Sequence, residues 1–124
     1  MKLSAGVLVT LLLLAGAGPA AAAPLTPRQT VQAYLDAIAA GDARTICHLM
    51  SAKARREVKH EWAARSCPQA LTDIPRVLGH VTIAKVEIHG PDATVWVNDA
   101  RYSDSGNDNV TLRRVHDHWF MTSI

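Results

Sequence analysis

The feature that most constrains the fold is a change of hydrophobic period near Gly79. Before it, apolar residues recur at helical spacing, so that Val31, Leu35 and Ile38 share one face. After it, apolar and polar residues alternate, which is typical of half-buried strands. The chain therefore predicts helices first and strands second, which indicates an α+β fold.

Three to four helices are expected before Gly79. Thr26 and Gln29 can form a capping box for the first helix, and Gly41 can end it. The third helix is expected to run to about Ala64, with Trp62 one turn after Val58 and both packed toward the strands. The residues that cap or open the four helices are, in chain order, Thr26, Asp42, Ser51 and Pro68.

The second half predicts a four-stranded antiparallel meander at residues 81–89, 93–102, 110–116 and 119–124. In the first strand, alternation places Ala84, Val86 and Ile88 on one side. A turn at 90–92 and a longer loop at 103–108 join the first three strands, and Asp117-His118 forms the last turn.

The first 22 residues have the three parts of a secretory signal peptide. Lys2 supplies the positive start, an apolar run follows, and Ala20 and Ala22 are the small residues before a cut at Ala22/Ala23. The strongly apolar run is shorter than the roughly 20 residues that a spanning helix needs. We therefore expect a signal peptide at 1–22, one domain at 23–124, and a secreted protein without a stable membrane anchor after cleavage.

The chain has two cysteines, Cys47 and Cys67. An even number of cysteines in an exported chain favours a disulfide. Because there is no C-x-x-C pair and no zinc-finger spacing of histidines, a redox or metal pair fits less well. We expect a structural bridge, with no metal and no cofactor.

The charge balance argues against nucleic acid as a partner. Removing Lys2 from the 13 Lys and Arg residues leaves 12, against 11 Asp and Glu residues. Phosphate binding needs a concentrated basic surface. In the third helix the basic residues are interleaved with Glu57 and Glu61, so its charged face is expected to be solvated.

Three segments carry a family resemblance: VQAYLDAIAAGD at 31–42, GPDATVWV at 90–97 and LRRVHDHW at 112–119. Together they resemble small exported members of the nuclear-transport-factor-2-like (cystatin-like, polyketide-cyclase-like) superfamily, over residues 27–124. The resemblance implies a curved sheet wrapped against the helices, a cone that can enclose an apolar pocket. The Asp117-His118 turn departs from the usual Gly-containing turn of the family, which affects the turn type rather than the fold.

Enzymes of this superfamily work from polar groups inside the cone, so the resemblance directs attention to inward polar residues. Alternation places Asp99 and Arg114 inward and diagonally close, and the guanidinium would keep the carboxylate ionised with a lowered pKa. That suits a structural ion pair better than a catalytic base, with ligand anchoring and catalysis as alternatives. The candidate pocket residues are Tyr34, Trp62, Asp99, Arg114 and Trp119.

The outer sheet face has its own candidate surface. Trp96, Val115 and Phe120 are expected there, and if contiguous they would form an exposed apolar patch. Such patches often mark protein partners or homodimer surfaces.

No motif identifies a reaction, because the chain has no Gly-rich phosphate loop, no Ser nucleophile elbow and no H-E-x-x-H. No catalytic residue is therefore assigned. The favoured hypothesis is an exported non-catalytic domain that binds a small apolar ligand or a protein partner. A small isomerase, dehydratase or cyclase that uses the cone pocket, and an accessory component of an envelope assembly, are the alternatives.

Overall fold

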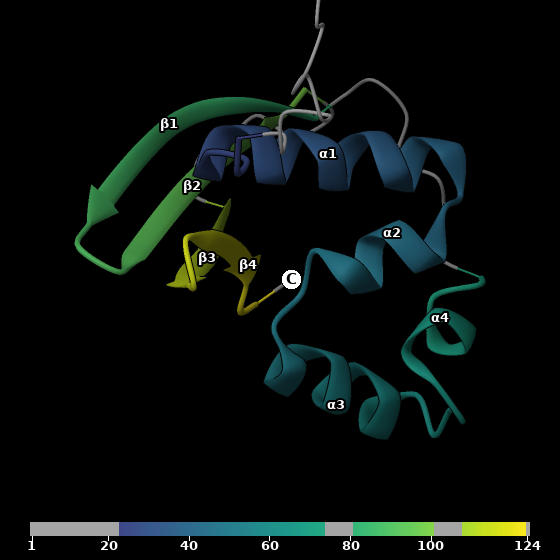
Figure 1. Cartoon of the computed structure of the whole chain (residues 1–124). Helices are drawn as coiled ribbons and strands as arrows, with labels where there is room; N and C mark the ends of the chain where they lie inside the picture. Colours follow the sequence, from purple (N-terminus) through teal and green to yellow (C-terminus); the bar gives the residue numbers. More distant parts are fainter. Residues whose placement is uncertain (1–22, 74–80, 101–107, 124) are drawn as a thin grey trace, which may run out of the picture.

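The computed structural model describes residues 23–73, 81–100 and 108–123, and it confirms the predicted α+β class (Figure 1). Four helices precede four strands: α1 (Pro27–Ala40), α2 (Ala43–His48), α3 (Ala52–Glu61), α4 (Cys67–Ala70), β1 (Val81–His89), β2 (Asp92–Asp99), β3 (Asp108–Val115) and β4 (His118–Met121). The predicted signal peptide and the 103–107 part of the predicted loop lie outside the described residues. Within the described ranges, none of the helices has the length and apolar character needed to span a membrane.

Polar side chains start α1, α2 and α3 as the sequence predicts, whereas α4 starts at Cys67 with Ser66 as its N-cap, one residue before the predicted Pro68. The Thr26 hydroxyl accepts from the Gln29 backbone N–H at 3.2 Å, and the Gln29 side-chain oxygen accepts from the Thr26 N–H at 3.0 Å. Gly41 ends α1 with a φ of 68°, where glycine avoids the penalty of a side chain. The N-cap residues of the four helices are Thr26, Asp42, Ser51 and Ser66.

The third helix is shorter than predicted. It ends at Glu61, and Ala63 adopts a left-handed φ of 47°. The Ala64 N–H then donates to the Lys59 carbonyl at 3.0 Å, which closes the helix end. Glycine usually occupies such a position, so nothing in the sequence indicated this stop. Trp62 becomes the cap residue and is 62% exposed, so its predicted packing toward the strands is wrong.

The four strands pair in chain order, each antiparallel to the next. A β-bulge between Ile83 and Lys85 changes the phase of β1. Ile83 and Val86 therefore both pack against the core, whereas Ala84 is exposed. The strict alternation that placed Ala84 beside Val86 is wrong, because a bulge inserts one extra residue into a strand.

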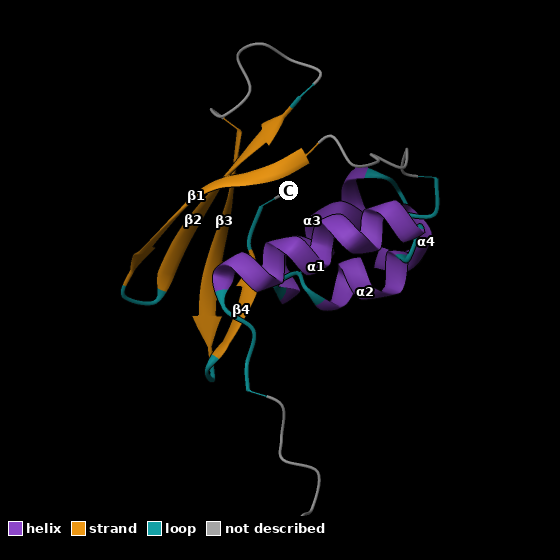
Figure 2. Cartoon of the chain, turned by 90° about the horizontal axis from the view of Figure 1, so that it is seen from above, coloured by secondary structure: helices purple, strands orange, loops and turns teal. Residues whose placement is uncertain are grey.

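The segment between α2 and α3 lies along the β4 edge of the sheet. The Ser51 N–H donates to the Met121 carbonyl, and the Met121 N–H donates to the Leu49 carbonyl, both at 2.8 Å. Met50 forms a parallel bridge to Met121. These bonds hold the helices on one face of the sheet, as Figure 2 shows.

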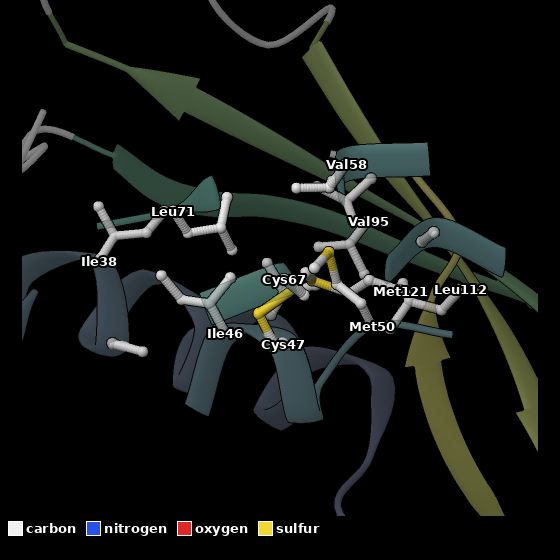
Figure 3. Packing of buried hydrophobic residues seen from close by; sticks show 14 of the residues in the cluster. Ile38, Ile46, Cys47, Met50, Val58, Cys67, Leu71, Val95, Leu112 and Met121 are labelled. Carbon is white, nitrogen blue, oxygen red and sulfur yellow. A yellow bond between two sulfur atoms is a disulfide. The ribbon is translucent and has the colours of Figure 1, made fainter. Parts of the chain in front are cut away.

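The core lies between the helices and the inner face of the sheet (Figure 3). Met50, Val95, Leu112 and Met121 are almost completely buried there. Ile88, which alternation places on the same side as Val86, is 56% exposed because it lies beside the last residue of β1, next to the turn.

The predicted disulfide between Cys47 and Cys67 is confirmed, with the two Cα atoms 6.1 Å apart. It joins α2 to α4, and both cysteines are buried. Figure 3 shows the bond between the helices, near Ile46 and Met50. The bridge therefore encloses α3, which lies between the two cysteines in the sequence.

Candidate ligand-binding cavity

A cavity of about 390 Å³ lies between α1 and the inner face of the sheet. This volume is near the lower end of the range for small-molecule sites, which is about 300–1,000 Å³. Helix α1 and strands β1, β2 and β3 all contribute to its wall. The lining residues are Val31, Tyr34, Leu35, Ile38, Val81, Val97, Asp99, Asp108, Asn109 and Val110.

The wall from α1 follows from the helical period of the sequence. Val31, Leu35 and Ile38 lie on the inner side of the helix, and Tyr34 lies beside them at the i+3 position from Val31. Figure 1 shows the curved path of β1 and β2 beside α1. On β2, alternation brings Val97 and Asp99 to the same face as the buried Val95.

The polar part of the lining consists of Tyr34, Asp99, Asp108 and Asn109. Asp99 is only 9% exposed. Tyr34 is half-buried, and burial raises the pKa of its hydroxyl above the ordinary value of 10.0. The hydroxyl is therefore protonated near neutral pH, where it can both donate and accept a hydrogen bond. Among the described lining residues none is a histidine, cysteine or lysine.

Two of the five predicted pocket residues line this cavity. Tyr34 and Asp99 do so, whereas Trp62, Arg114 and Trp119 do not. Trp62 lies at the exposed end of α3. Trp119 is partly buried and packs against the core.

The predicted proximity of Asp99 and Arg114 is wrong. In the observed register Leu112 pairs with Ala93, and the Arg114 N–H donates to the Pro91 carbonyl at 2.7 Å. Asp99 lies at the opposite end of β2 from these contacts. The prediction assumed that the hairpin closes around residues 103–108, which would place Asp99 near Leu112, but β3 begins at Asp108, opposite Val97. The pairing is therefore shifted by several residues.

Arg114 instead lies over an aromatic ring. Its guanidinium carbon is 5.6 Å from the centroid of the Trp119 ring, across the β3–β4 hairpin. The neighbouring Arg113 forms the ion pair that the register allows, with 3.3 Å between its Nη1 and the Asp92 carboxylate. Both partners of that pair are more than half exposed, so its effect on stability is small.

The three residues of the predicted outer patch do not form one surface. Trp96 pairs with Asn109, and the Lys85 ammonium lies 5.1 Å from the centroid of its ring. Phe120 pairs with Arg113, four positions further along β3. Val115 is 45% exposed. Val115 and Phe120 instead line a separate groove of about 250 Å³ with Met50, Ser51, Ala52 and Arg55.

Sequence reasoning did not place Val81, Asp108, Asn109 and Val110 at the pocket. The β1 bulge brings Val81 into the lining, and the β2–β3 register brings in the other three. Alternation shows which face a side chain is on, but it does not show the register between strands. The length of the loop after Asp99 sets the register between β2 and β3, so it would have been the signal that decides which β3 residues line the pocket.

Comparison with known protein families, with curated proteins and with solved structures finds no match to this chain. The resemblance to the nuclear-transport-factor-2-like superfamily therefore stays a prediction from the three sequence segments given above. Within the described ranges, no group of three or more His, Cys, Asp or Glu side chains is arranged to hold a metal ion.

Proposed function

We propose that this protein binds a small, mainly apolar ligand in the cavity between α1 and the sheet, without catalysing a reaction. The observation that carries the proposal is the cavity itself, with its apolar walls and a few polar groups. Small-molecule sites commonly combine these features. We also propose that the fold is of the nuclear-transport-factor-2-like type.

The lining indicates what kind of ligand fits. Leu35, Ile38, Val97 and Val110 offer apolar surface, and burying it against an apolar ligand is favourable by about 25 cal/mol per Å². The polar side includes two carboxylates and a hydroxyl. A neutral ligand with one hydrogen-bond donor matches these acceptors better than an anionic ligand, which the carboxylates of the lining would disfavour.

The same lining supports binding over catalysis. A general base or acid is most effective when its pKa lies near the working pH. Burial moves the pKa of Tyr34 further from neutrality. The described lining also has no histidine, which is the side chain most often used for proton transfer near pH 7.

Titration with a neutral fluorescent naphthylamine, N-phenyl-1-naphthylamine, tests the proposal. Val97→Trp would fill part of the cavity and is expected to weaken binding by about tenfold or more, which corresponds to about 1.4 kcal/mol. Ile88→Trp is the matched control, because Ile88 lies on the same sheet but is exposed and outside the cavity. Leu35→Trp replaces Val97→Trp if the latter does not fold by circular dichroism.

The proposal fails if wild type does not bind the probe, or if a folded cavity variant binds it as tightly as wild type. It also fails if the protein turns over a substrate and the cavity variants abolish that turnover, because the cavity would then be an active site.

We further propose that the protein acts after export, in an oxidising compartment. The disulfide supports this, because such bonds persist mainly in oxidising environments. Sequencing the N-terminus of exported material should give Ala23 or its neighbour. Material that retains Met1 would contradict the proposal.

A further inference from the structure

Three adjoining hollows follow one side of α3, on the side of the molecule away from the cavity. The first is lined by His48, Arg55 and the disulfide cysteines, together with Pro68. The second shares Arg55 and Cys67 with the first, and adds Ala52, Arg56 and Lys59. The third shares Arg56 and Lys59 with the second, and adds His60, Ala63 and Ala64. Because neighbouring hollows share residues, they form one continuous groove, which we call the α3 groove.

The α3 groove is basic along its whole length. Its charged and titratable lining residues are Arg55, Arg56, Lys59, His48 and His60, and none of the described residues that line the three hollows is acidic. The acidic residues of α3 are Glu57 and Glu61, which lie on another flank of the helix. Glu57 is within 3.8 Å of the Lys53 ammonium there. The sequence shows basic and acidic residues interleaved, but the helix separates them in space.

One of these cations has a structural task. The Arg55 guanidinium donates to the Met50 carbonyl at 2.9 Å and to the Cys47 carbonyl at 3.4 Å, which holds the end of α2. Arg56 and Lys59 are both exposed, and neither makes a salt bridge among the described residues. These two side chains are therefore the part of the groove that can meet a ligand without disturbing the fold.

We infer that the α3 groove binds a linear anionic polysaccharide. Charge complementarity requires an anionic partner, and three adjoining open hollows in a row fit an extended chain. Residues three apart on a helix are about 5–6 Å apart, so Arg56 and Lys59 present two positive charges at an interval similar to the advance of one sugar residue. A polymer with an acidic group on each sugar can meet these charges in turn.

An exposed tryptophan favours a sugar chain over an acidic peptide. Trp62 directly precedes Ala63, which lines the groove, and its side chain is 62% exposed. Trp62 itself does not line the hollows. The C–H face of a pyranose ring stacks on an indole ring, so an exposed tryptophan next in the chain to a groove residue suits an acidic sugar. Figure 1 shows α3 on the far side of α2 from α1, which makes the groove independent of the cavity.

Retention on immobilised polygalacturonate tests the inference, with uncharged dextran as the neutral control. The groove variant is Arg56→Gln/Lys59→Gln. The matched control is Arg28→Gln/Lys53→Gln, which removes the same charge from exposed positions outside the groove. The groove variant is expected to bind about tenfold more weakly, since two exposed ionic contacts are lost, and the control is expected to bind within about twofold of wild type.

Polyglutamate provides the second comparison, because it carries the same carboxylate on a peptide backbone. Trp62→Ala should weaken binding to polygalacturonate and leave binding to polyglutamate unchanged. The inference is overturned if wild type does not bind polygalacturonate, or if both double variants lose binding equally, which would indicate net charge alone. It is also overturned if polyglutamate or anionic lipid vesicles bind more tightly than polygalacturonate through Arg56 and Lys59.

Discussion

Removing the Cys47–Cys67 bond should destabilise the protein mainly by freeing the unfolded chain. The cysteines are 20 positions apart, so the bond closes a loop of about 21 residues. In the chain-entropy model a loop of this length contributes about 3 kcal/mol. For a domain of this size, 1 kcal/mol corresponds to a change of about 4–8 °C in melting temperature. Reduction should therefore lower the melting temperature by about 12–24 °C.

Two forms of the protein separate the effect of breaking the bond from the effect of removing its sulfur atoms. Reduced wild type keeps both sulfur atoms, whereas Cys47→Ala/Cys67→Ala also removes them from a buried site and should be slightly less stable. Intact mass first confirms that reduced wild type has gained two hydrogens. Thermal and urea unfolding are then followed by circular dichroism. The urea m-value should rise on reduction, because an unlinked unfolded chain exposes more surface. A change in melting temperature below about 4 °C, with complete reduction, would refute the reasoning.

Three further predictions concern single positions. Ala63→Gly should stabilise the protein by about 0.5–1 kcal/mol, because glycine adopts the left-handed φ of 47° without strain. The control Ala64→Gly, at a position where φ is not positive, should destabilise the protein. Equal effects of the two variants on urea unfolding would contradict the argument. His116→Asn/Asp117→Gly should raise the midpoint of urea unfolding, because both residues have positive φ (49° and 65°) and Asn-Gly is preferred in such two-residue turns. An unchanged midpoint would contradict this prediction. Wild type should lose stability as pH rises from about 10 through the raised folded-state pKa of Tyr34, because the tyrosine ionises first in the unfolded chain. Tyr34→Phe should lose less stability over the same pH range. Parallel pH–stability curves for the two proteins would show that Tyr34 does not cause the loss.

Local signals predicted the elements of the fold well. The capping box at Thr26 and Gln29, and glycine at position 41, correctly marked both ends of α1. The predicted bounds of the first strand agree with β1, Val81–His89. Each of these signals acts within a few residues, so it is visible in the sequence. The early end of α3 was missed because alanine, rather than glycine, occupies the left-handed position.

The candidate site was predicted less well, because it depends on contacts between distant segments. Tyr34 and Asp99 were placed inward from the phase of one helix and one strand, and both line the cavity. Arg114 was placed beside Asp99 from an assumed register, and the observed register separates them. Trp62 was placed in the core from an i,i+4 relation to Val58, but it is the C-cap residue of α3 and its side chain is 62% exposed.

The disulfide links the stability of the fold to the α3 groove but not to the cavity. Cys67 lines two of the three hollows of the groove and Cys47 lines one, whereas neither cysteine lines the cavity. Without the bond, α4 is held beside α3 only by noncovalent packing. At a temperature well below its melting point, Cys47→Ala/Cys67→Ala should therefore bind polygalacturonate more weakly and bind the naphthylamine probe as wild type does. Equal loss at both sites would mean that the bond supports the whole domain, and an unchanged groove would mean that packing alone positions α4.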